Sequence, residues 1–193
     1  SSYNKYIEIF NATGETVNLN DYAFPTVGND PTTSGEHEYW NEFTSGATLA
    51  NNSIYIVCHP QADAQILDKC DQTYQYFSNG NDGLKLVKGI ETNFTVIDTL
   101  GDWKTSGIPN GTGGWAVCGE DNATVNGSLI KKDGVEGNPD WDDSRGTNAD
   151  DCDWKIIANE DWSDIDKHTW NGSSTGGSGG GGSGGGGSGG GGS

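Results

Sequence analysis

The sequence predicts an all-β protein, folded as an antiparallel sandwich or barrel of short strands with one short helix. Short apolar stretches rich in β-branched and aromatic residues recur along residues 1–171, and each is bounded by Gly, Asn, Asp or Pro. Only one segment has its apolar residues at helical spacing. The length of residues 1–171 suits one domain with a substantial core, and such spacing of strands is typical of a sandwich.

Eight stretches are expected to form strands. KYIEIF alternates apolar and polar residues and ends in a Gly-containing turn, and the next stretch alternates with Val17 and Leu19 on one face. SIYIVC is continuously apolar, as a buried strand is. The expected strands cover residues 5–10, 16–22, 53–58, 83–88, 94–98, 114–119, 127–132 and 153–157.

The expected helix lies in HPQADAQILDKC. Pro60 is a start signal, and Ala62, Ile66 and Leu67 follow at helical spacing without a β-branched run. These features predict a short helix near residues 61–69.

The last 22 residues form a separate segment. Residues 172–193 contain 15 glycines and neither a charged nor an apolar side chain, and they repeat Gly-Gly-Gly-Gly-Ser. Such a segment is most simply an engineered flexible linker, so a fusion partner is implied. Residues 1–171 are therefore expected to form the only folded domain.

The charge balance excludes several classes of partner. The formal net charge is −18, and no cluster of Lys and Arg offsets it. An acidic surface repels phosphate groups, so we expect neither nucleic-acid nor anionic-membrane binding. No run of 18 apolar residues is present, so we expect no membrane insertion.

The cysteines favour an oxidising compartment. Their number is even, and they lack the Cys-x-x-Cys spacing of zinc or redox sites. Four cysteines allow three connectivities, of which we favour Cys58–Cys70, closing a strand–helix loop, and Cys118–Cys152. The sequence therefore predicts a secreted, extracellular protein without a resident cofactor.

Seven Asn-x-Ser/Thr sequons support the same compartment. Chance predicts about three in a chain with this content of Asn, Ser and Thr, so a glycoprotein of the secretory pathway is expected. The alternative is that a polar surface rich in loops collects these residues. The expected acceptors are Asn11, Asn51, Asn93, Asn110, Asn122, Asn126 and Asn171.

Five segments in register resemble the lamin-tail domain family. YIEIFNATGETVNLNDYAF is similar to the opening of such domains, and LANNSIYIVCHPQADAQIL to the strand that leads into their short helix. FSNGNDGLKLVKG with TVIDTLGD resembles the centre of the extracellular branch. GWAVCGEDNATVNGSLIKK and DWKIIANEDWSDIDKHT resemble its last strands and terminal segment.

This resemblance implies an immunoglobulin-like antiparallel β-sandwich. In nuclear lamins the fold is a protein- and DNA-binding tail, and in secreted microbial proteins it is an accessory module beside nucleases, phosphatases or surface proteins. The cysteines, sequons and acidity of this chain depart from nuclear lamins, so the nuclear role is not carried over.

Enzyme signatures are absent from the sequence. It has no Gly-x-Ser-x-Gly, His-Glu-x-x-His, P-loop or dinucleotide-binding pattern. Cys58 and His59 are adjacent and point to different sides of a strand end. The aspartates stand in polar loops, where no apolar neighbourhood would raise a pKa for acid catalysis. We therefore expect no catalytic residues.

The acidic stretch NPDWDDSRGTNADDCDW could bind calcium. An EF-hand is excluded because Arg145 stands where that loop needs Gly, but an irregular site remains an alternative. The other interpretation is a surface loop of Asx-turns. The candidate ligands are Asp140, Asp142, Asp143, Asp150 and Asp151.

Aromatic residues suggest a glycan site. Trp103, Trp141 and Trp162 stand among polar residues, as exposed stacking rings would, whereas Trp115 and Trp154 lie in apolar strands and are expected in the core. The alternative for the first three is a ring lying across the end of the sandwich.

These observations predict a non-catalytic extracellular module for binding, adhesion or structural assembly. Its partner would be an extracellular protein, the matrix or a glycan surface. The alternative is an accessory glycan- or calcium-dependent binding module of a secreted hydrolase.

Overall fold

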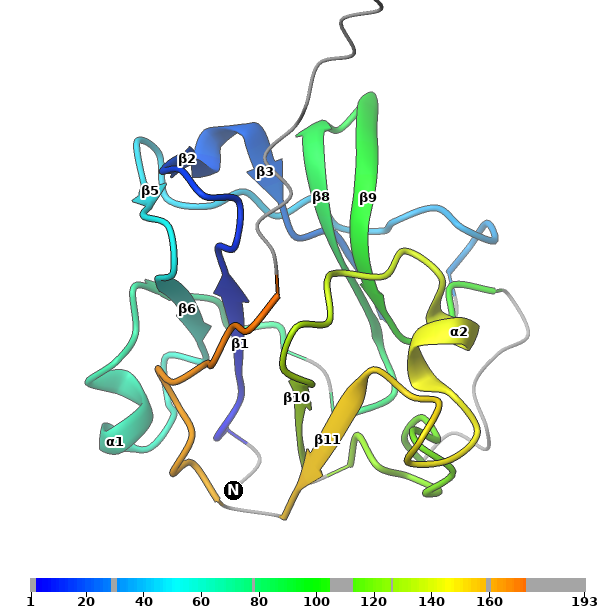
Figure 1. Cartoon of the computed structure of the whole chain (residues 1–193). Coiled ribbons are helices and arrows are strands. Elements are labelled where there is room, and N and C mark those ends of the chain that lie inside the picture. The colour runs from blue at the N-terminus through cyan, green and yellow to red at the C-terminus, as the bar shows by residue number, and fades with distance from the viewer. Residues whose placement is uncertain are drawn as a thin grey trace, which may run out of the picture.

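The computed structural model describes residues 3–28, 31–77, 79–104, 113–125, 127–158 and 161–172 (Figure 1). Within these ranges the chain is mostly β, with two short α-helices, α1 (Ala64–Leu67) and α2 (Trp141–Arg145), and one 3-10 helix, η1 (Leu19–Asp21). The strands are β1 (Tyr6–Phe10), β2 (Val17–Asn18), β3 (Tyr22–Ala23), β4 (Thr26–Val27), β5 (Thr48–Leu49), β6 (Ile54–Cys58), β7 (Gln72–Thr73), β8 (Gly83–Ile90), β9 (Asn93–Leu100), β10 (Ser128–Lys131) and β11 (Trp154–Ile157).

The longest strands form the hairpin β8–β9, which Figure 1 shows in green. The other edge of β8 pairs with β3 and then with β4, so these two short strands are halves of one interrupted strand. Pro25 lies at the interruption, because proline has no N–H to donate, while its carbonyl still accepts from the N–H of Lys85.

A second sheet has the order β1-β6-β7. β6 is antiparallel to β1 and parallel to β7, and α1 lies in the crossover between β6 and β7. Asp63 caps α1 by accepting a hydrogen bond from the N–H of Gln65. Because β6 takes the centre, β1 is an edge strand of this sheet.

The remaining strands form two pairs, β2 with β5 and β10 with β11. The buried side chains gather in three clusters rather than one. Phe24 and Val57 belong to the first, Ile56 and Ile66 to the second, and Trp115 and Trp154 to the third. No helix of the described ranges has the length and apolar character needed to cross a membrane.

The β class, seven of the expected strand regions and the helix near residues 61–69 are confirmed, although the helix is shorter than expected. The strand at 114–119 is wrong: Val117 makes only an isolated bridge, and Cys118 and Gly119 take positive φ angles of 55° and 81°. A second helix, α2, forms inside the acidic stretch. The stretch at 16–22 is split by η1 into two short strands.

Candidate ligand-binding cleft

A large cleft separates β1 from β8, β9 and β10. Its volume is about 1870 Å³, and residues of all four strands line it. Small-molecule pockets span roughly 300–1,000 Å³, so this cleft has room for a larger occupant. In Figure 1, β10 lies between β11 and β1.

The β1 wall carries an ionisable group in unusual surroundings. Burial, together with the nearby negative charges of Asp164 and Asp166, raises the pKa of Glu8 from 4.5 to about 7. The backbone N–H of Asp166 donates to Oε1 of Glu8 over 2.6 Å and partly opposes this shift. Burial raises the pKa of Tyr6 as well, and the charges of Glu8, Asp164 and Asp161 add to the effect.

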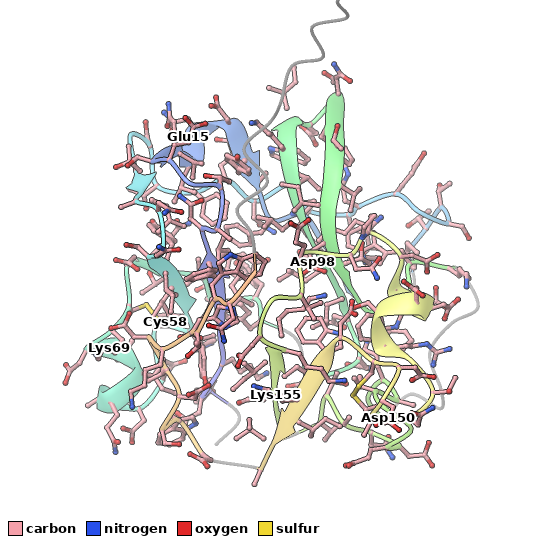
Figure 2. The ribbon with its side chains drawn as sticks, in the orientation of Figure 1. Glu15, Cys58, Lys69, Asp98, Asp150 and Lys155 are labelled. Carbon is pink, nitrogen blue, oxygen red and sulfur yellow. A yellow bond between two sulfur atoms is a disulfide. The ribbon has the colours of Figure 1, made fainter. Side chains whose placement is uncertain are left out.

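The opposite wall carries a lysine between two carboxylates. Nζ of Lys131 lies 3.2 Å from Oδ1 of Asp98 and 3.3 Å from Oδ2 of Asp153, and it stands 4.3 Å from the ring centroid of Trp154. Burial raises the pKa of Asp98, and Lys131 opposes that rise. Figure 2 shows Asp98 near the middle of the molecule, whereas Asp150 lies at its periphery.

Glu8 and Asp98 belong to separate electrostatic groups. The charges that act on Glu8 are those of Asp164 and Asp166, and the charge that acts on Asp98 is that of Lys131. The expectation that no aspartate has a raised pKa is wrong for Asp98, which lies on a strand rather than in a polar loop.

Aromatic side chains line the cleft and its rim. Tyr39 and Tyr76 are 59% and 72% exposed, and both belong to the lining. The ring of Phe10 packs against His168, with centroids 4.6 Å apart, and against Trp170 at 6.3 Å. These contacts hold the C-terminal segment against one face of β1.

The acidic stretch uses its aspartates within the protein. Asp140 caps α2 by accepting from the N–H groups of Asp142 and Asp143 at 3.0 and 3.3 Å. Asp142 pairs with Lys104 at 3.2 Å and with Arg145 at 2.9 Å, and the hydrogen bond from Lys104 lowers its pKa.

The carboxylates of Asp143 and Asp151 also have partners in the protein. Asp143 accepts from the side-chain amide of Asn138 at 2.9 Å. Asp151 accepts from the hydroxyl and N–H of Thr147 and from the N–H of Asn148, and these bonds lower its pKa. The N–H of Asp150 donates to Asn148. Across the described ranges, no three His, Cys, Asp or Glu side chains are placed to share a metal ion.

Two of the three tryptophans expected to be exposed are buried. Trp103 and Trp141 are each 6% exposed, so the prediction of free stacking rings is wrong for them. Nζ of Lys85 lies 3.9 Å from the ring centroid of Trp103, and Trp141 packs in the third cluster. Trp162 is half-buried, contacts the second cluster and lines the cleft. Trp115 and Trp154 are in the core, as expected.

The expected disulfides are present. Cys58–Cys70 and Cys118–Cys152 have Cα–Cα distances of 5.9 and 5.1 Å. Both bonds indicate an oxidising environment such as the extracellular space.

The sequons differ in accessibility. Asn11 is 4% exposed, and its side-chain nitrogen, which a glycan would occupy, donates to the carbonyls of Glu15 and Leu49 at 2.8 Å each. The prediction that Asn11 carries a glycan is therefore at odds with the burial and hydrogen bonding of its side chain. Asn51, Asn93, Asn122 and Asn171 are exposed. Asn110 and Asn126 lie outside the described residues.

Comparison with protein-family models, with curated proteins and with solved structures finds no match. Membership of the lamin-tail family therefore stays a prediction.

Sequence reasoning missed Glu8, Asp98 and Lys131. A weak signal for Glu8 was available, because a charged residue alternates with apolar ones in YIEIF and must share a face with Tyr6 and Phe10. The pairing of Lys131 with Asp98 joins residues far apart in sequence, and no local pattern could indicate it.

Proposed function

We propose that this chain is a non-catalytic extracellular binding module, and that the cleft beside β1 receives part of another macromolecule. The cleft itself carries this proposal. It exceeds the size of small-molecule pockets, and aromatic rings lie at its rim. The disulfides support an extracellular setting.

A lamin-tail-like, immunoglobulin-like arrangement of residues 1–171 is part of the same proposal. The antiparallel pairing of β1 with β6 and of β8 with β9 supports it, as does the short helix after β6. In this proposal its role is adhesion or structural assembly.

Glycan binding is the second candidate. Trp154, Trp162 and Trp170 line the cleft together with Glu8 and several aspartates, and sugar sites combine flat rings with carboxylates. The carboxylates of Asp140, Asp142 and Asp151 already have protein partners, so the cleft rather than the acidic stretch carries this second candidate.

The test is a binding screen of the full chain against arrays of glycans and of random peptides, with and without EDTA. The variant Tyr39→Ala/Tyr76→Ala removes two exposed rings at the cleft, and we expect about a tenfold loss of affinity for the selected ligand. Ile90→Ala is the matched control, because Ile90 is 66% exposed and lies outside the cleft lining. An array without ligands, or ligands that the double variant binds unchanged, would refute the proposal.

A further inference from the structure

Among the residues that the structure describes, no strand pairs with the backbone groups on the outer edge of β1. The N–H of His59 donates to the carbonyl of Lys5, and the N–H of Asn11 donates to the carbonyl of Ser53. In an antiparallel pair, hydrogen-bonded residues alternate, so Ile7 and Ile9 also bond to β6. The N–H and C=O groups of Tyr6, Glu8 and Phe10 therefore point away from β6.

A second strand edge lines the same cleft. The N–H of Lys132 donates to the carbonyl of Asp153, which fixes the register of β10 on β11. By the same alternation, the backbone groups of Leu129 and Lys131 point away from β11. β10 lies between β11 and β1 in Figure 1, and the side chain of Ser128 on β10 is near enough to Tyr6 on β1 to lower its pKa, which burial raises. Both strands belong to the cleft lining.

The two faces of β1 differ in chemistry. Ile7 and Ile9 pack against the first apolar cluster. Glu8 lies on the other face, where Asp164 and Asp166 of the C-terminal segment add negative charge. A strand placed beside β1 would have side chains alternating between an apolar face and an acidic face.

We propose that an extended segment of a partner protein, with basic residues alternating with apolar ones, adds as a β-strand to the outer edge of β1. The inference rests on the proposed function and names the class of its partner. Backbone hydrogen bonds to Tyr6, Glu8 and Phe10 give affinity, and Lys or Arg side chains meeting Glu8 and Asp164 give specificity. The added strand lies between β1 and β10 and joins their two sheets.

Charge complementarity selects this occupant over two others. The chain has a net charge of −18, so a second copy brings its own repulsive charge to the cleft. The Gly/Ser segment 172–193 offers neither the basic nor the apolar side chains that the two faces need.

The test uses the full chain and a synthetic peptide of about eight residues that alternates Lys and Val. One control peptide carries Glu in place of Lys. A second is N-methylated at alternate residues, which removes the N–H groups along one edge. We expect both controls to bind at least about tenfold more weakly. In amide hydrogen exchange, Tyr6, Glu8 and Phe10 should exchange at least about tenfold more slowly when the peptide is bound.

Ile7 and Ile9 are internal controls, because their amides already bond to β6 and should change little. Binding of the Lys peptide that leaves the amides of Tyr6, Glu8 and Phe10 unprotected would overturn the inference, and so would equal binding of the Glu peptide. Protection of these amides at rising protein concentration without peptide would also overturn it, in favour of a second copy.

The outcomes separate this inference from the proposed function. A ligand that depends on Tyr39 and Tyr76 but leaves the β1 amides unprotected sustains a binding cleft and rejects strand addition. Failure of every peptide and glycan on the arrays rejects both.

Discussion

The acidic stretch around α2 and the cleft beside β1 differ in how completely the protein satisfies its own polar groups. The first holds the densest run of carboxylates in the sequence, yet Asp140, Asp142 and Asp151 all accept hydrogen bonds or pair with cations of the same chain. In the second, one edge of β1 lacks a strand partner within the described ranges.

This difference separates charge density from binding capacity. A carboxylate that caps a helix or pairs with a lysine has little left to offer a ligand, whereas an unpaired strand edge offers backbone groups at regular spacing. Sequence composition indicates the acidic stretch as a candidate binding site, whereas the pairing of strands indicates the edge of β1.

Loss of the Cys118–Cys152 disulfide should produce the largest effect in this comparison. It ties the acidic stretch to the third cluster across a sequence separation of 34. On the chain-entropy model, Cys118→Ser/Cys152→Ser should lower the free energy of unfolding by about 4 kcal/mol. Cys58→Ser/Cys70→Ser closes a shorter loop and should cost about 3 kcal/mol. Urea unfolding measures both, and equal stability of the first variant and the wild type would contradict the role of this bond.

Lys131→Met should have the next largest effect, because Lys131 joins the two regions. Its Nζ contacts Asp98 of β9, Asp153 beside β11 and Oγ of Ser144 in α2. Leaving two partly buried carboxylates without a cation should cost about 3 kcal/mol at pH 7. The loss should shrink as the pH falls and Asp98, whose pKa is raised by burial, becomes protonated.

The matched control is Lys155→Met. Lys155 pairs with Asp133 at 3.4 Å on the surface, where its side chain is 51% exposed. A surface pair contributes less than about 1 kcal/mol. Chemical unfolding at pH 7 and pH 4 compares the two variants, and similar losses would contradict a special place for Lys131.

Glu8→Gln should stabilise the free protein at alkaline pH. The pKa of Glu8 is raised from 4.5 to about 7 in the folded protein. Below pH 4.5 the group is protonated and the folded state bears no cost of ionising it. Above pH 7 the group is ionised, and the folded state is destabilised by the full cost of burying its charge. Allowing for partial exposure, the variant should gain about 2 kcal/mol at pH 8, or roughly 4–8 °C in Tm. No gain is expected at pH 4.

The same substitution should weaken binding of the Lys-containing peptide at pH 8, since it removes a negative charge that faces the ligand. Glu15→Gln is the control, because Glu15 is exposed in the turn after β1. Thermal unfolding of Glu8→Gln at pH 8 and pH 4 measures the expected gain in stability. An equal gain at pH 4 would show that burial of the charged form of Glu8 is not the cause of the gain.

Millimolar calcium should produce the smallest effect. The carboxylates of Asp140, Asp142 and Asp151 already have protein partners, so we expect no shift in Tm on adding Ca²⁺. Thermal unfolding with Ca²⁺ and with EDTA measures this. A rise in Tm with Ca²⁺ that Asp140→Asn/Asp142→Asn abolishes would support a calcium site in the acidic stretch.

The strands with clear local patterns could be predicted from sequence. YIEIF, SIYIVC and the β8–β9 hairpin carry their own alternation or continuous apolarity, and each forms as expected. GWAVCG is apolar like these strands but forms no strand, because the chain turns at Cys118 and Gly119. Helix α2 has Asp140 as cap, acidic residues in its first turn and Gly146 after its end, but it is too short to show periodicity.

The burial of Trp103 and Trp141 could not be predicted, because their sequence neighbours are polar and the residues that cover them come from distant segments. The cleft could not be predicted for the same reason, because residues of distant segments line it. A strand is an edge strand when no other strand pairs with one of its sides, and this depends on the topology of the whole sheet.

Asn11 links the fold to the order of synthesis. Its side-chain amide is buried by bonding to the carbonyl of Leu49, which follows 38 residues later in the chain. A growing chain that has not yet reached Leu49 cannot form this bond, so the native contact protects the sequon only after the later segment has been made. A sugar attached to the side-chain nitrogen of Asn11 before then would block the bond to Leu49. Asn11 can therefore carry a sugar or complete the native contact, but not both.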